Sequence, residues 1–166
     1  MPGFYLALIA VLLSGFAARD QITLAGITAR QGARPAVLVR GLVLAMATAA
    51  FAAWAGIYIA ATLAPPARAF LGALVLVLAG LESLVLAPRY RAKEPTHSLG
   101  ATGLVLLLHQ LTDAARFLVF GVSVAMNAPL AAGAGGALGG MCLLAGAGLF
   151  PDAFLARRAR LGRRGI

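Results

Sequence analysis

The sequence predicts an all-α fold: a polytopic transmembrane helical bundle of two inverted three-helix repeats, the second of which lacks its last helix. Three observations support this class. Hydrophobic residues make up 61% of the 166 residues and charged residues only 11%, whereas a soluble domain carries about 25% charged residues. The apolar residues gather in runs long enough to cross a bilayer, which takes about 20 residues. Finally, the chain resembles itself at a spacing of 93 to 94 residues.

The apolar runs define five spans, and the first and fourth are long and interrupted in the middle by polar residues. The predicted spans are residues 2–29, 35–64, 67–87, 99–126 and 128–150. No Lys or Arg precedes the first run, as a cleaved signal peptide would require, so we expect this segment to be retained. The predicted units are a first repeat over residues 1–88, a cytoplasmic loop over 89–98, a second repeat of two spans over 99–150, and a basic cytoplasmic tail over 151–166.

Basic residues set the expected orientation, because cytoplasmic loops carry an excess of Lys and Arg. With the N-terminus outside, only Arg68 falls on the outer side. Eleven basic residues fall inside: Arg30, Arg34, Arg40, Arg89, Arg91, Lys93, Arg157, Arg158, Arg160, Arg163 and Arg164. We therefore expect a multi-pass protein of the inner (plasma) membrane with a cytoplasmic C-terminus. No basic stripe alternates with aromatic residues, so the expected partner of these charges is anionic lipid and not nucleic acid.

The internal similarity indicates a duplication. Asp20 and Asp113 lie 93 residues apart, each within an interrupted span, and Pro35 and Pro129 lie 94 apart, each opening the next span. Because each half contains an odd number of spans, the halves have opposite orientations, an arrangement common in secondary transporters. The third span of the second half should begin near Phe154, but arginines take the place of the apolar run.

Ionisable residues within predicted spans are the functional candidates, since a charge at the bilayer centre costs at least about 2.5 kcal/mol. Asp20 and Asp113 are the candidate metal ligands, because hard cations prefer carboxylate oxygens. Glu82 lies six residues before Pro88, near the expected inner surface, and we expect a structural role. The candidate ion-binding set is Asp20, Asp113, Gln110, Thr23 and Thr112, with Arg19, Arg116 and His109 as charge partners. A buried network in which the arginines neutralise the aspartates remains open as an alternative.

The fifth span is rich in glycine and contains two overlapping G-x-x-x-G pairs, Gly135/Gly139 and Gly136/Gly140. Small residues let helix backbones approach closely in lipid, so the pairs predict either intramolecular packing, which we favour, or the face of a homo-oligomer. The chain has no HExxH, Ser/His/Asp set or Gly-rich phosphate loop, and we expect neither an enzyme nor a resident cofactor.

The chain resembles the Gdt-type manganese/calcium–proton exchangers. Residues 29–35, Ala-Arg-Gln-Gly-Ala-Arg-Pro, are similar to a segment that follows the family's duplicated Glu-x-Gly-Asp motif. Asp20 and Asp113 match the motif's aspartates, whereas its glutamates fall on Ala17 and Gln110. The resemblance implies exchange of Mn²⁺ or Ca²⁺ for protons, with the motif acids binding the ion. The alternative is a degenerate, non-transporting relative that acts as a membrane assembly partner, which the glycine-rich span and the short second half favour.

Overall fold

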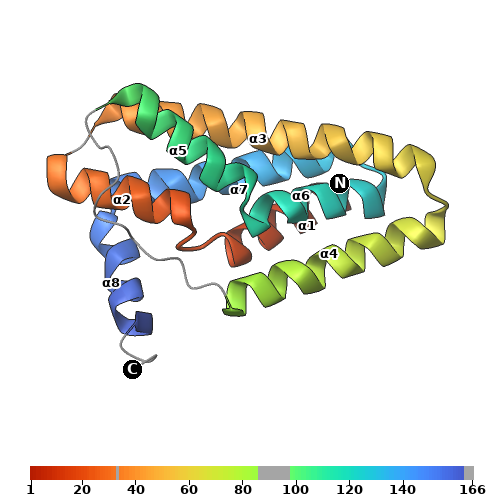
Figure 1. Cartoon of the computed structure of the whole chain (residues 1–166). Coiled ribbons are helices and arrows are strands. Elements are labelled where there is room, and N and C mark those ends of the chain that lie inside the picture. Colours follow the sequence, from red (N-terminus) through yellow and green to blue (C-terminus); the bar gives the residue numbers. More distant parts are fainter. Residues whose placement is uncertain (33, 86–97, 163–166) are drawn as a thin grey trace.

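The computed structural model contains only helices and their connections over the residues that it describes, 1–32, 34–85 and 98–162 (Figure 1). The helices are α1 (Pro2–Ser14), α2 (Arg19–Gln31), α3 (Pro35–Thr62), α4 (Pro65–Val85), α5 (Leu99–Leu111), α6 (Ala114–Met126), α7 (Pro129–Leu149) and α8 (Pro151–Gly162). The all-α prediction is thereby confirmed. Most of the predicted 89–98 loop, with Arg89, Arg91 and Lys93, lies outside the described residues, as do Arg163, Arg164 and the side chains of Arg157, Arg158 and Arg160.

Several helices are long and apolar enough to cross a membrane. Three qualify alone: α3, α4 over Pro65–Glu82, and α7. The pairs α1/α2 and α5/α6 qualify together but bend by 57° and 48°, and counting each pair as one span brings the number to five. Both bends fall within the two spans whose polar interruptions the sequence shows. The described helices are therefore compatible with a membrane protein of several spans.

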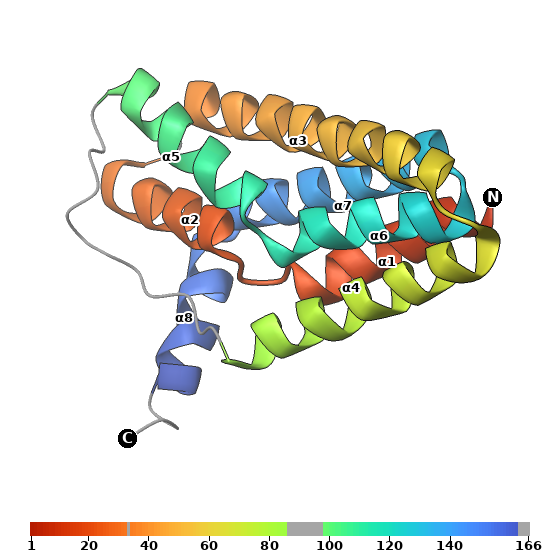
Figure 2. The same cartoon turned by 45° about the vertical axis from the view of Figure 1, so that its right-hand side comes forward.

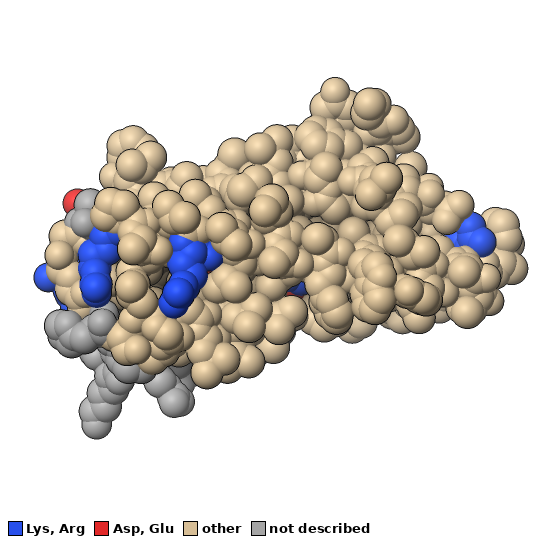
Figure 3. All heavy atoms as spheres, turned by 90° about the horizontal axis from the view of Figure 1, so that it is seen from above, with Lys and Arg blue, Asp and Glu red and all other residues tan. Residues whose placement is uncertain are grey.

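The surface of the bundle is apolar, and its interior is built largely from small residues. Large side chains such as Trp54 on α3 and Leu104 on α5 are 52% and 58% exposed, while alanines such as Ala45 and Ala132 are fully buried. Figure 3 shows basic side chains at the two ends of the visible face and an almost uncharged surface between them. A soluble protein rarely exposes so large an apolar area, whereas lipid accommodates it.

Helix α7 lies at the centre of the bundle, and its glycines provide the necessary space. A Cβ atom at Gly136 would overlap the Val119 side chain of α6, and one at Gly135 would overlap the backbone of Phe4 in α1. A Cβ atom at Gly139 would lie 3.1 Å from Val11, a tight contact without overlap. Both G-x-x-x-G pairs are buried within the chain. The geometry fits intramolecular packing of this face.

Helices α4 and α8 lie at the edges of the bundle. Helix α4 packs against α6, and α8 packs against α2. In Figures 1 and 2 the described C-terminal end of α4 lies at the level of the two bends. Phe154 of α8 is buried and stacks on Phe16 at a ring-centroid distance of 4.9 Å. The first part of the predicted tail is therefore a packed helix, although it is not among the described helices that qualify as membrane spans.

Candidate functional site

The first bend is a four-residue connection held by one glutamine. Between α1 and α2 the chain passes through residues 15–18, where Ala17 adopts a left-handed conformation with φ of 62°. The buried side chain of Gln21 spans this connection: its Nε2 donates to the Gly15 carbonyl at 2.6 Å, and its Oε1 accepts from the Ala17 N–H at 2.9 Å. Buried backbone groups away from water need such partners, so Gln21 stabilises the open backbone at the bend.

The second bend is tighter. Helix α5 ends at Leu111, Thr112 is its C-cap, and Asp113 is already the N-cap of α6. Its hydrogen bonds are local: the N–H and the hydroxyl of Thr112 both donate to the Leu108 carbonyl, at 3.2 and 2.8 Å, and the Arg116 N–H donates to the Asp113 carbonyl at 2.9 Å. No side chain bridges this bend as Gln21 bridges the first, within the interactions that the described residues make.

Both bends leave the N-terminus of a half-helix inside the bundle with a carboxylate beside it. Asp20 is the second residue of α2, and Asp113 caps α6. Asp20 is only 5% exposed, and its Oδ1 accepts from the Gln21 N–H at 2.8 Å. Asp113 is half-buried. The partial positive charge of a helix N-terminus stabilises a nearby carboxylate, which explains how two acids are tolerated at this depth.

Arg116 lies within electrostatic reach of both carboxylates. Its side chain is 6% exposed, and its guanidinium interacts electrostatically with both Asp20 and Asp113. Its Nε donates to Thr48 Oγ1 of α3 at 2.7 Å. The guanidinium passes close to α7, where a Cβ atom at Gly140 would lie 3.2 Å from Nη2. Gly140 thus leaves the space that Arg116 occupies.

Gln110 completes the buried cluster. It is fully buried; its Oε1 lies 3.4 Å from Thr48 Oγ1, its Nε2 donates to the Gly41 carbonyl at 3.3 Å, and its side chain also interacts with Asp20. Nearby, His109 Nδ1 lies 3.5 Å from Thr23 Oγ1, and the imidazole is within electrostatic reach of Asp20. Most of the candidate residues therefore meet around α2, α5 and α6.

Two candidates do not join the cluster. Thr112 is exposed, and its hydroxyl donates to the Leu108 carbonyl at 2.8 Å, one turn back along its own helix. Small hydroxyl side chains commonly form this bond at helix ends, and it turns the oxygen away from the acids. Arg19, expected as a charge partner, is exposed on α2 although it precedes the buried Asp20. Adjacent helix positions point about 100° apart, which explains the difference.

Two other residues belong to the site although they were not selected from the sequence. Thr48 receives the hydrogen bond from Arg116, and it is the only hydroxyl residue between Arg40 and Tyr58 in an otherwise apolar helix. A single hydroxyl residue within a long apolar run is the feature of the sequence that could have indicated a role for Thr48. Glu82 acts electrostatically on Asp113, although its position six residues before Pro88 predicted only a structural role.

The cluster contains oxygen atoms that could act as ligands, and its net formal charge is negative. Two carboxylates and one guanidinium leave one formal negative charge, and Glu82 adds to the negative field on Asp113. Among the described residues no three His, Cys, Asp or Glu side chains are grouped as a metal site would group them. Any cation held here would rely on neutral oxygens such as those of Gln110 and Thr48 in addition to the two carboxylates.

Comparisons of the chain with protein-family models, with curated proteins and with solved structures found no match.

Proposed function

We propose that the protein is a secondary transporter that exchanges a cation for protons, with Asp20 and Asp113 as the carboxylates that carry the charge. One observation supports this proposal above the others: acids from both bent helix pairs act on a single buried guanidinium. Discontinuous membrane helices whose half-helix ends converge in the bundle interior are the usual setting for ion sites in such carriers. The resemblance to manganese/calcium–proton exchangers makes Mn²⁺ or Ca²⁺ the proposed cargo.

The inverted-repeat arrangement is part of this proposal. Helix α4 packs on α6, and α8 packs on α2, so the last helix of each half contacts the second half-helix of the other. Helices α3 and α7, which follow the bends in their respective halves, also pack against each other. Such reciprocal pairings are what a two-fold relation between halves requires. Rocking of one half against the other would then open the cluster to alternate sides.

Arg116 takes the role of an internal counter-cation in this mechanism. With no ion bound, its guanidinium compensates one carboxylate and leaves a net negative charge for a proton or an incoming cation. A divalent ion would compete with Arg116 for the same oxygens, because both need the two aspartates. Protonation of one aspartate would weaken ion binding, which couples the two species. No charge from Arg19 enters this balance, since that side chain is exposed.

The proposed orientation places the end with Arg30, Arg34 and Arg40 in the cytoplasm and Arg68 outside. In the structure Arg30 closes α2, Arg34 caps α3, and Arg68 lies in the first turn of α4, at the opposite end of the bundle (Figure 1). We propose the inner membrane as the location, with the N-terminus outside.

Flux in proteoliposomes tests the transport proposal. Vesicles loaded with a metal-sensing dye should take up Mn²⁺ or Ca²⁺ against an imposed pH gradient, and Asp113→Asn should reduce the rate to that of empty vesicles. Asp152→Asn is the matched control, because Asp152 is exposed on α8 and away from the cluster. Equal flux from Asp113→Asn and wild type, with both proteins monodisperse, would contradict the assignment of this site.

The second candidate function is that of a non-transporting assembly partner in the membrane. Arg116 favours it, because the guanidinium already neutralises much of the negative charge that an ion would require. This function predicts a stable partner in a detergent pull-down and no ion flux under any gradient. The same flux assay therefore separates the two candidates.

A further inference from the structure

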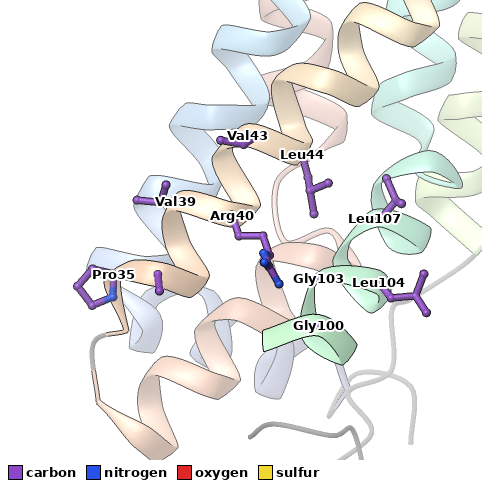
Figure 4. Close-up of a pocket in the computed structure, with 10 residues that line it drawn as sticks. Pro35, Val39, Arg40, Val43, Leu44, Gly100, Gly103, Leu104 and Leu107 are labelled. Carbon is purple, nitrogen blue, oxygen red and sulfur yellow. The ribbon is translucent and has the colours of Figure 1, made fainter. Parts of the chain in front are cut away.

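A groove runs between α3 and α5 on the outside of the bundle. The two helices lie side by side with their N-termini at the same end of the molecule (Figure 1). The groove has a volume of about 810 Å³, and its walls include Val39, Val43, Leu104 and Leu107 (Figure 4). Gly100 and Gly103 line it on the α5 side and keep it open.

One charged side chain enters this apolar groove. Among the described residues that line the groove, Arg40 is the only charged one, and Figure 4 shows its side chain reaching from α3 toward α5. Its Nη1 donates to the Leu99 carbonyl at the start of α5, and its stem crosses Gly103, where a Cβ atom would lie 2.8 Å from Arg40 Cδ. The guanidinium is thus held in place while its remaining N–H groups stay available, because a guanidinium carries five donors.

The depth of Arg40 matches the headgroup level of a bilayer. It lies five residues into α3, or about 7.5 Å along the helix axis at about 1.5 Å per residue. Val43 and Leu44 follow about one turn deeper on α3, and Leu107 lies deeper on α5. The groove is therefore cationic near the membrane surface and apolar below it. Arg30 and Arg34 lie at the same end of the bundle.

We propose that this groove binds one anionic phospholipid, with the phosphate at Arg40 and an acyl chain along Val43, Leu104 and Leu107. The charge pattern argues for this occupant: a second copy of the chain or an apolar helix would bury the guanidinium without a counter-charge, which is costly. An anionic lipid supplies both the negative charge and the apolar tail, and basic residues near the membrane surface attract such lipids. This proposal rests on membrane insertion alone and does not depend on transport.

Native mass spectrometry of the purified full chain tests the proposal. Detergent-solubilised protein would be incubated with equal amounts of phosphatidylglycerol and phosphatidylcholine of the same chain length. We expect wild type to retain the anionic lipid in preference by about fivefold, the effect of one cationic side chain near a lipid surface. Arg40→Gln should reduce the preference to about onefold to twofold. Arg68→Gln, at the opposite end of the bundle, should leave it unchanged.

Two further measurements distinguish the occupants. Leu104→Trp should fill the groove and reduce retention of phosphatidylglycerol, and glycerol phosphate at matched concentration should neither bind nor raise the unfolding temperature, because it lacks the acyl chain. The proposal is overturned if Arg40→Gln keeps the wild-type preference, if both lipids bind wild type equally, or if Leu104→Trp instead dissociates a dimer of the wild-type protein.

Discussion

The two bends of the bundle solve the same problem in different ways. The first opens the backbone over four residues, includes a left-handed Ala17, and is bridged by two hydrogen bonds from the Gln21 side chain in addition to the backbone bond from Ala18 to Gly15. The second turns from Thr112 to Asp113 with backbone hydrogen bonds and one exposed, local bond from the Thr112 hydroxyl. The open bend carries a deeply buried acid, Asp20, and the tight bend carries a half-buried one, Asp113.

The difference assigns separate duties to the two halves. Gln21 fixes the first bend, so the first half provides a rigid, buried carboxylate. The second bend provides both the more accessible carboxylate and Arg116, its counter-charge. A site of this kind would accept a proton or ion first at Asp113 and hold it with Asp20. Four substitutions test or refine this contrast.

Removal of Arg116 should have the largest effect. Arg116→Gln leaves Asp20 and Asp113 without their buried counter-charge, and breaking a buried charge pair costs about 3–5 kcal/mol. We expect a correspondingly lower midpoint in SDS-induced unfolding followed by circular dichroism. The double variant Asp20→Asn/Arg116→Gln should recover part of the loss, because one buried charge is removed. Equal stability of Arg116→Gln and wild type would show that the guanidinium does not compensate the acids.

Replacement of Gln21 should have the next largest effect and should distinguish the bends. Gln21→Leu leaves the Ala17 N–H without its partner, at about 1–3 kcal/mol, and leaves the Gly15 carbonyl with only its bond from the Ala18 N–H. Thr112→Ala at the second bend removes only an exposed hydroxyl bond to Leu108 and should change the stability by less than about 0.5 kcal/mol. Comparable losses in the two variants would contradict the idea that the first bend depends more strongly on a side chain than the second.

The main features of the fold can be predicted from the hydrophobic pattern of the sequence, but the contrast between the two bends cannot. Apolar runs of bilayer length predict the spans, and the polar patches around Asp20 and Asp113 predict where two of them bend. The packed helix α8 was not predicted, because the arginines beyond Phe154 hide the buried ring that stacks on Phe16. The role of Gln21 depends on the backbone path through residues 15–18, which residue type alone does not determine.

Some residues of the candidate site can be predicted from the sequence, whereas others are revealed only by tertiary packing. The duplication indicates that Asp20 and Asp113 occupy related positions, and the structure brings both within reach of Arg116. The sequence suggested Thr112 as an oxygen ligand, but its hydroxyl instead donates to the Leu108 carbonyl of its own helix. Thr48 lies 68 residues before Arg116 in the chain, so only tertiary packing reveals their contact.

Adding one methyl group at Gly140 should disturb the second half with a moderate effect. Gly140→Ala places a Cβ atom 3.2 Å from Arg116 Nη2, and overpacking a buried position costs about 1–3 kcal/mol. Gly80→Ala is the matched control, because nothing lies within 4 Å of its Cβ position and replacing a helical glycine with alanine gains up to about 1 kcal/mol. The two variants should shift the SDS midpoint in opposite directions. A stabilised Gly140→Ala would show that Arg116 can move aside freely.

The smallest expected effect distinguishes the backbones of the two bends. Ala17 has a φ of 62°, a conformation that costs a non-glycine residue about 1–2 kcal/mol. Ala17→Gly relieves that strain but gives the unfolded chain more freedom, worth about 0.4–1 kcal/mol, so we expect a net stabilisation of a few tenths to about 1 kcal/mol. Thr112 has a φ of −98° and no strain to relieve, so Thr112→Gly should destabilise. Parallel SDS titrations of both variants measure the difference, and a shift of the same sign in both would remove the distinction between a strained first bend and a relaxed second one.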